Sequence, residues 1–239
     1  MVIHGIQKLT LIDYPEKTAA TLFFKGCNFR CPYCHNASLV AEKALHDVLQ
    51  GGQIAPALSP DQIFDFLKKR SSVLDGVCIT GGEPLLQDGI EDFIFQIKNM
   101  GFDVKLDTNG QLPDKLKFLV QNKYVDYVAM DIKNSFKNYS KTIGIENFST
   151  INVEKSADFL ISTNVDYEFR TTVVREFHTA DDFHSIGKRL RGARKYFLQQ
   201  FKDSDTNISQ GLHPCSKEQM QEFKGILASY IPSASLREI

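Results

Sequence analysis

The sequence has almost no excess of charge of either sign. Its 239 residues include 28 Lys and Arg against 29 Asp and Glu, which gives a formal net charge of −1. Proteins that bind nucleic acid or anionic membranes through their overall electrostatics carry a broad basic face. The composition therefore argues against both kinds of partner. One short basic stretch, residues 188–195, is typical of the solvated end of a helix.

Long apolar runs are also missing. No stretch approaches the roughly 18 consecutive apolar residues that a membrane-spanning helix needs. The amino terminus, MVIHGIQKLTLIDYPEK, lacks the charged start and unbroken apolar run of a secretory signal. We therefore expect a soluble protein of the cytoplasm with no membrane partner. With 42% hydrophobic residues, the chain can still bury a sizeable core.

Cysteines are few and unevenly placed. There are five, and three of them, Cys27, Cys31 and Cys34, fall within eight residues. An odd, clustered set does not suit the disulfide framework of a small secreted protein. It indicates metal binding or redox chemistry in a reducing compartment. Cys78 lies in an apolar run and is expected in the core, whereas Cys215 has no motif around it.

Short β-branched or aromatic runs alternate with stretches of helical spacing. The strand-like runs are residues 21–24, 76–80, 103–108, 127–132, 168–174 and 195–199. This alternation predicts a parallel sheet with right-handed crossovers, and six strands are too few for a complete eight-stranded barrel. We predict an α/β fold, a partial (β/α)6 TIM-like barrel of parallel strands. One domain should cover residues 1–239, with a core over about 18–200 and a polar loop plus C-terminal helix over 201–239.

Polar signatures follow four of the predicted strands. Cys27 comes after the first, residues 81–83 (Gly-Gly-Glu) after the second and residues 108–110 (Thr-Asn-Gly) after the third, while residues 131–133 (Asp-Ile-Lys) close the fourth. In barrel-type α/β folds the chemistry collects at the carboxyl ends of the strands. We therefore place the functional site at the C-terminal rim.

Three cysteines on one loop can hold an iron–sulfur cluster, because thiolates are the usual ligands of such centres. A four-iron cluster bound by Cys27, Cys31 and Cys34 would keep one iron open. An open metal position is typical of a site that binds a substrate or cofactor. The alternative is a zinc knuckle, but zinc sites usually have a second pair of ligands, which is missing here.

The spacing Cys27-x3-Cys31-x2-Cys34, with Tyr33 before the last cysteine, resembles the signature of the radical S-adenosylmethionine superfamily. The wider context, FFKGCNFRCPYCHN preceded by LTLIDYPEK, is similar to the branch that activates glycyl-radical enzymes. Within that branch it most resembles the activating proteins of anaerobic ribonucleoside-triphosphate reductase, and more distantly those of pyruvate formate-lyase. The resemblance runs from about residue 5 to residue 199.

The resemblance implies an oxidoreductase with a [4Fe–4S] cluster and S-adenosyl-L-methionine as cofactors. The amino and carboxylate groups of the cofactor chelate the open iron. An electron from a flavodoxin or ferredoxin then yields a 5′-deoxyadenosyl radical, which takes a hydrogen atom from a glycine of the partner enzyme. That partner would be an anaerobic ribonucleoside-triphosphate reductase. Two alternatives stay open: a radical enzyme acting on a small molecule or peptide, and a non-enzymatic metal-binding or electron-carrier module.

The resemblance also assigns residues to the cofactor. Gly82 and Glu83 match a segment that grips its amino group, although a glycine turn with Glu83 at a helix start is a structural alternative. Arg170 would hold the cofactor carboxylate with its guanidinium group, unless it faces outward from a strand edge. The full cofactor-binding set is Tyr33, Cys34, His35, Gly82, Glu83, Asp131, Lys133 and Arg170, with no acid–base role for His35 and no catalytic residue beyond cluster and cofactor.

Two carboxylates, Asp107 and Asp131, close neighbouring predicted strands. If unpaired they would repel each other, so a cation or ligand is expected beside them. In pyruvate formate-lyase relatives the matching positions help to bind a monovalent cation, and the resemblance places such a cation at Asp107, Thr108 and Asp131. The sixth strand departs from those relatives, because residues 199–201 read Gln-Gln-Phe where the relatives have a histidine.

Overall fold

A computed structural model describes residues 1–40 and 57–237. The strands in this part of the chain are β1 (Ile3–Thr10), β2 (Ala19–Phe24), β3 (Gly76–Gly81), β4 (Asp103–Thr108), β5 (Tyr127–Asp131), β6 (Asp166–Val173), β7 (Tyr196–Gln200) and β8 (Ala234–Arg237). The helices are α1 (Ala37–Val40), α3 (Pro60–Lys68), the 3-10 helix η1 (Pro84–Leu86), α4 (Ile90–Asn99), α5 (Pro113–Gln121), α6 (Tyr139–Ile143), α7 (Ile151–Ser162), α8 (Ala180–Arg189) and α9 (Lys217–Ala228). The order of strands in the sheet follows the chain.

The predicted parallel α/β class is confirmed. Strand β2 pairs with β3, β3 with β4, β6 with β7 and β7 with β8, all in parallel. All six predicted runs form strands, β2 to β7. The predicted number of strands is wrong, because β1 lies antiparallel to β2 and β8 lies parallel to β7. These two additions extend the sheet at its two ends in strand order.

Packing divides the chain into two compact units whose segments interleave along the sequence. The first unit comprises Met1–Asn28, Ser38–Thr108 and Leu112–Val128. The second unit comprises Phe29–Ala37, Asn109–Gln111 and Ala129–Ile239. The cysteine motif therefore belongs to both, because Cys27 lies in the first unit and Cys31 and Cys34 lie in the second.

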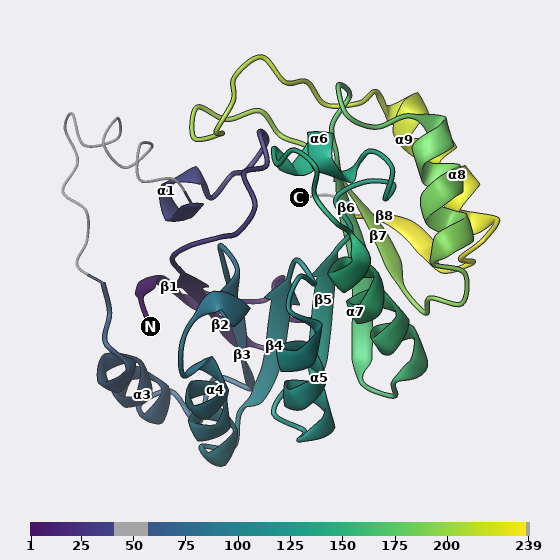
Figure 1. The fold of residues 1–239 in the computed structure, drawn as a ribbon. Helices are drawn as coiled ribbons and strands as arrows, with labels where there is room; N and C mark the ends of the chain where they lie inside the picture. The colour runs from purple at the N-terminus through teal and green to yellow at the C-terminus, as the bar shows by residue number, and fades with distance from the viewer. Residues whose placement is uncertain (41–56, 238–239) are drawn as a thin grey trace. The chain divides into compact units, whose positions relative to one another are not determined.

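The first unit is built on β1 to β4, with helices α3, α4 and α5 beside the strands (Figure 1). Helix α3 begins with a reciprocal capping box, in which the Ser59 hydroxyl accepts from the Gln62 amide and the Gln62 side chain accepts from the Ser59 amide. Phe24 of β2 packs edge-on against Phe93 of α4, which in turn contacts Phe64 of α3. The helices that were expected after Ser59 and near residues 90 and 113 are confirmed.

The second unit carries β6, β7 and β8 and helices α6 to α9. Helices α8 and α9 lie side by side (Figure 1), and the rings of Phe183 and Phe223 join them with centroids 4.6 Å apart. A buried ion pair joins β6 to β8: Arg237 donates to both oxygens of the fully buried Glu168, at 2.5 and 2.8 Å. This pair fixes the C-terminal strand, which sequence analysis did not predict.

Two further expectations concern single regions. Lys188 and Arg189 close helix α8, and Lys188 is exposed, which confirms the solvated helix end. Cys78 is buried in β3, as predicted. None of the helices in residues 1–40 and 57–237 is both long enough and apolar enough to cross a membrane.

Candidate functional site

The first half of the cysteine loop leaves β2 in the first unit. The Gly82 amide donates to the Phe24 carbonyl at 2.9 Å, and the Glu83 amide donates to the Gly26 carbonyl at 2.8 Å. A β-carbon on Gly82 would stand 2.0 Å from that Gly26 oxygen, which no side chain tolerates. Gly82 therefore acts through the backbone, by letting it approach Gly26, the residue before Cys27.

Glu83 is buried beneath this contact, with 1% of its surface exposed. Its carboxylate accepts a hydrogen bond from the Thr108 hydroxyl at 2.9 Å and another from the Leu85 amide at 3.2 Å. The second bond caps η1, which is the structural alternative raised from the sequence. Glu83 thus joins the end of β3 to the end of β4 and also holds a negative charge at the strand ends.

Asp107 is paired with neighbouring side chains of its own unit. Its Oδ1 accepts from the ammonium of Lys105 at 2.5 Å, and its Oδ2 accepts from the Thr80 hydroxyl at 3.2 Å. Lys105 is 2% exposed, although it stands in the middle of β4. Residues two apart on a strand share a face, so this Lys–Asp pair was readable from the sequence, and we missed Lys105 and Thr80.

The second half of the cysteine loop is held in the second unit. The Arg30 amide donates to the Ile143 carbonyl at 2.9 Å, at the end of α6. Gly144 caps that helix with φ +68°, and a β-carbon there would lie 2.4 Å from the Arg30 oxygen. The Cys34 amide donates to the Cys31 carbonyl at 3.0 Å and closes a tight turn. The end of α6 and Gly144 thus contact the cysteine loop in this unit as well.

Aromatic rings form a wall along the last part of the motif. Tyr33 is buried against Phe177 and Phe201, with ring centroids 6.0 and 6.5 Å away. The His35 ring stacks on Phe201 at 5.7 Å, and its Nε2 lies 2.7 Å from the Lys202 carbonyl. The residues that follow β7 therefore support the cysteine loop here, where relatives were expected to differ. The His35 ring is thus held by Phe201 and by the Lys202 carbonyl.

A charged triad closes β5 in the same unit. Asp131 accepts from the Lys133 ammonium at 2.8 Å through Oδ2 and from Arg170 Nε at 2.6 Å through Oδ1. Burial alone would raise the pKa of Asp131, but the two cations hold it well below its usual range. Burial likewise opposes the charge on Lys133, yet Asp131 holds the pKa of Lys133 above its usual value. Arg170 thus faces Asp131, and the triad carries two positive charges against one negative.

A buried polar network supports the chain that follows the triad. His178 is 4% exposed, and its Nε2 lies 2.9 Å from the Lys133 carbonyl. Asp182 accepts from Ser135 at 2.5 Å and from Asn138 at 2.7 Å. The network fixes the turn after Lys133 to α8. Sequence analysis did not find it, because its members are polar residues that no single motif links.

None of the five cysteines forms a disulfide. Burial raises the pKa of Cys78 to about 12 and that of Cys215 to about 11, which suits inert core positions. Burial also raises the pKa of Cys34, while the nearby Lys133 ammonium opposes that rise. In the part of the chain that the structure describes, no three His, Cys, Asp or Glu side chains are grouped to hold a single metal ion.

The donor set fits an iron–sulfur cluster with a bound nucleoside cofactor. Cys27, Cys31 and Cys34 are reduced thiols on one loop, and a cluster needs such ligands. The Tyr33 hydroxyl is buried and has no hydrogen-bond partner among the described residues, which is unusual for a buried polar group. A ligand beside the motif would supply that partner.

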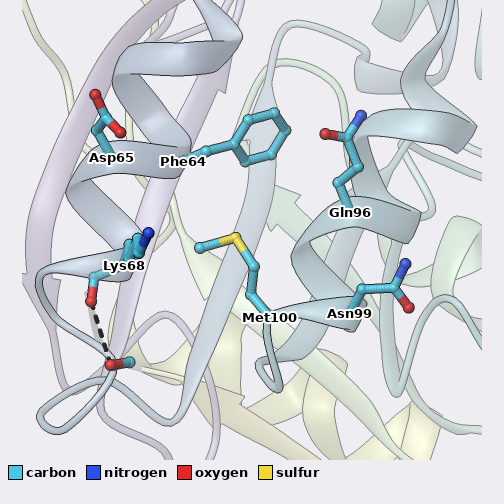
Figure 2. Close-up of a pocket in the computed structure, with 7 residues that line it drawn as sticks. Phe64, Asp65, Lys68, Gln96, Asn99 and Met100 are labelled. Carbon is cyan, nitrogen blue, oxygen red and sulfur yellow. Dashed lines mark hydrogen bonds between the residues drawn. The ribbon is translucent and has the colours of Figure 1, made fainter.

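A separate pocket of about 540 Å³ lies on the first unit between α3 and α4. Figure 2 shows Phe64 of α3 and Met100 facing it, with Gln96 and Asn99 of α4 on the other side. It contains none of the predicted site residues. Met100 directly follows α4 and precedes the start of β4 by three residues, so the pocket lies near the beginnings of strands rather than their ends.

Comparison with known proteins identifies the family. A model described as "Radical SAM superfamily" matches residues 21–186, a span that includes every candidate site residue. The chain is 34% identical to a candidate glycyl-radical enzyme activating enzyme of Methanocaldococcus jannaschii, over 100% of this chain and 96% of that protein. It is 26% identical to the pyruvate formate-lyase 1-activating enzyme of Escherichia coli, over 95% of each.

A solved structure supports the fold. Streptococcus suis SuiB bound to the precursor peptide SuiA matches with a TM-score of 0.67 at 12% identity, over 91% of this chain and 48% of that one. This chain therefore spans about half the length of SuiB. The cofactors that the family implies are a [4Fe–4S] cluster and S-adenosylmethionine. The chain belongs to the radical SAM superfamily and is an oxidoreductase of that family.

Proposed function

We propose that this protein installs a glycyl radical on a partner enzyme. The observation that carries the proposal is similarity over the whole length of two activating enzymes, those of Methanocaldococcus jannaschii and Escherichia coli. We also propose that residues 1–239 work as one domain, in the cytoplasm.

The cluster would be bound by Cys27, Cys31 and Cys34. In support, the residues next to the motif are held in both units, by Gly82 against Gly26 and by Gly144 against Arg30. These backbone contacts would hold the loop in place before metal arrives. Such preorganisation lowers the entropic cost of assembling a site.

The second unit would bind the carboxylate of S-adenosylmethionine. Asp131, Lys133 and Arg170 carry a net charge of +1, and a guanidinium group suits a carboxylate. Gly82 and Glu83 would receive the amino group, since Glu83 keeps a buried carboxylate at the strand ends. Tyr33, Cys34 and His35 would lie along the cofactor, with the Tyr33 hydroxyl satisfied by it.

Bound together, the cluster and cofactor would supply a 5′-deoxyadenosyl radical, formed with methionine when one electron from a flavodoxin or ferredoxin cleaves the sulfonium bond. Hydrogen transfer from a glycine Cα then gives 5′-deoxyadenosine and the glycyl radical. The protein's own residues bind, orient and exclude water. We propose anaerobic ribonucleoside-triphosphate reductase as the partner, because the motif LTLIDYPEK…FFKGCNFRCPYCHN most resembles its activators.

A peptide or small-molecule substrate is the second candidate. The structural match to SuiB, which was solved with its precursor peptide SuiA, favours it. That match shows the fold alone, at 12% identity over about half of SuiB. The activase proposal rests on higher identity over complete lengths.

The test is electron paramagnetic resonance under oxygen-free conditions. Reconstituted, reduced protein is mixed with S-adenosylmethionine and anaerobic ribonucleoside-triphosphate reductase, and we expect a glycyl-radical doublet with one 5′-deoxyadenosine per radical. A reductase variant with alanine at its radical glycine should give no doublet. If the doublet appears only with pyruvate formate-lyase, the proposed partner is wrong. If the cofactor is cleaved but neither enzyme is activated, the activase proposal fails.

A further inference from the structure

The resemblance noted from the sequence implies a monovalent cation at Asp107, Thr108 and Asp131, and the contacts of the two carboxylates argue against it. A bound K⁺ or Na⁺ needs oxygen atoms that can turn toward it. In the first unit both oxygens of Asp107 accept from Lys105 and Thr80. In the second unit both oxygens of Asp131 accept from Lys133 and Arg170. Each carboxylate is neutralised within its own unit.

Lys105 is the unusual member of these contacts. It is a charged residue inside a strand, flanked by the fully buried Val104 and Leu106, and only 3% of its side chain is exposed. A buried ammonium group is costly unless a carboxylate accompanies it. Asp107 supplies that carboxylate at 2.5 Å. The burial leaves the Lys105 ammonium little room to leave Asp107 for solvent.

A second cation at Asp107 would meet this ammonium. The Nζ of Lys105 already lies as close to Oδ1 as a metal-bound water or ion would, and two like charges in a buried site repel strongly. The residues present therefore do not fit the implied cation. The Lys105 ammonium is part of the chain and needs no ion from solution. Its neutralisation of Asp107 therefore does not vary with the concentration of K⁺ or Na⁺.

We infer that the Lys105 ammonium takes the place of a bound monovalent cation beside Asp107, so that this chain binds its cofactor independently of K⁺ and Na⁺. The inference deepens the proposed function, because it concerns the same strand ends. Its first tests require neither cluster nor cofactor.

The first test is cation binding and thermal unfolding of the full chain without cofactor. Equilibrium dialysis with radioactive rubidium or sodium should show no saturable binding by the wild-type protein. Its melting temperature should be equal in KCl, NaCl and choline chloride at one ionic strength. Lys105→Ala should melt lower in choline chloride and regain about 2–4 °C in KCl or NaCl, as expected for a site filled at several times its Kd. The melting temperature of Lys105→Arg, which keeps the charge, should be the same in all three salts.

The matched control is Lys98→Ala. Lys98 also donates to both oxygens of an aspartate in the first unit, Asp126, at 2.9 and 2.7 Å, but it is partly exposed and lies on α4. This variant should lose stability equally in all three salts. Saturable cation binding by the wild-type protein would overturn the inference. A folded Lys105→Ala variant with the same melting temperature in KCl, NaCl and choline chloride would overturn it as well. If Lys105→Ala does not fold, the wild-type dialysis still decides.

The second test concerns the cofactor and separates this inference from the proposed function. Cleavage of S-adenosylmethionine by the reconstituted wild-type protein should be equal with K⁺, Na⁺ or choline. A several-fold dependence on K⁺ or Na⁺ would overturn the inference. Absence of any cleavage would instead contradict the proposed function, while the dialysis and melting results would still decide the role of Lys105.

Discussion

The two units prepare their strand ends in different ways. In the first unit close backbone contacts dominate: Gly82 lies against Gly26, and the carboxylates of Glu83 and Asp107 accept hydrogen bonds from side chains of β3 and β4. In the second unit charged side chains dominate, because Asp131 collects two cations in a triad of net charge +1. Close backbone approach dominates at the strand ends of the first unit, and charge dominates at those of the second unit.

This difference has a physical consequence. Backbone contacts depend on steric fit and vary little with pH or salt, whereas ion pairs respond to both. We therefore expect the close approach at Gly82 to fail when atoms are added, whatever the pH or salt concentration. The triad of Asp131, Lys133 and Arg170 should fail when a charge is removed.

The largest effect should come from the motif that both units share. Replacing Cys27, Cys31 or Cys34 by alanine removes a proposed cluster ligand, and we expect cofactor cleavage to fall at least about 100-fold, the upper range seen for changes merely next to a metal. Iron content after anaerobic reconstitution checks this. Cys78→Ala, in the core, should keep its iron. Full iron content in a Cys31→Ala protein would contradict the assignment.

Gly82→Ala tests the steric half of the comparison. The new methyl group would stand 2.0 Å from the Gly26 oxygen, so the backbone before Cys27 must move. We expect a loss of about 3 kcal/mol in the free energy of unfolding, measured with urea. Gly5→Ala is the control, because nothing lies within 4 Å of its added carbon, and it should change stability by less than about 0.5 kcal/mol. Equal effects would show that close approach at Gly82 is unimportant.

Much of this arrangement could be predicted from the sequence, because its signals are local. The three cysteines form one contiguous motif, and β4 was predicted with its observed bounds, Asp103–Thr108. Helix α3 begins at the predicted capping residue, Ser59. Where residue type, spacing and turn chemistry agree within about ten residues, the sequence alone predicts the structure well.

The remainder depended on contacts that have no local signal. Strand β8 is four residues long and is held by Arg237, which reaches Glu168 from 69 positions away. Arg170 meets Asp131 across 39 positions, so its orientation could not be read from β6. At Asp107 the partner was two residues away and could have been found.

Arg237→Leu tests charge in the second unit away from the candidate site. Glu168 has no exposed surface, and Arg237 gives it two hydrogen bonds. Removing one partner of a buried ion pair leaves the other charge poorly compensated. We therefore expect a loss of about 3 kcal/mol in the free energy of unfolding. Arg175→Leu is the control: its pair with Glu176 is 3.6 Å long and largely exposed, and such pairs contribute little. If the Arg237→Leu variant is as stable as the wild type, Glu168 needs no charged partner there.

His178 gives the second unit a predicted response to pH. Burial lowers the pKa of His178 below 6.5, against the opposing effects of the Lys133 and Val174 backbone and the Asp182 carboxylate. A lowered folded-state pKa means that the unfolded chain binds the proton more readily. The contribution of neutral His178 to the free energy of unfolding is therefore complete above pH 6.5. It is lost as the pH falls toward the folded-state pKa, with a slope of at most about 1.4 kcal/mol per pH unit.

The measurement is urea unfolding of the wild type and His178→Gln between pH 5 and 7.5. The difference between the two proteins should change below pH 6.5 and stay constant above it. Asp182 should not titrate in this pH range. Burial raises the pKa of its carboxyl, but the hydrogen bonds from Ser135, Thr179 and Asn138 outweigh burial and lower that pKa below 3.8. A constant difference across the whole range would contradict a buried, neutral His178.

The smallest effect tests whether added volume is tolerated where nothing lies close to the new atom. Gly225 lies in the interior of α9, it is exposed, and nothing lies within 4 Å of where its β-carbon would be. Gly225→Ala should raise the free energy of unfolding by about 0.5–1 kcal/mol, since alanine restricts the unfolded chain and favours the helix. The melting temperature should rise by about 2–4 °C per kcal/mol. Gly144→Ala is the contrasting variant in the same unit, because its methyl group would meet the Arg30 carbonyl at 2.4 Å. If both variants were stabilised, close approach would matter only in the first unit; if Gly144→Ala alone is destabilised, glycine grips the cysteine loop from both units.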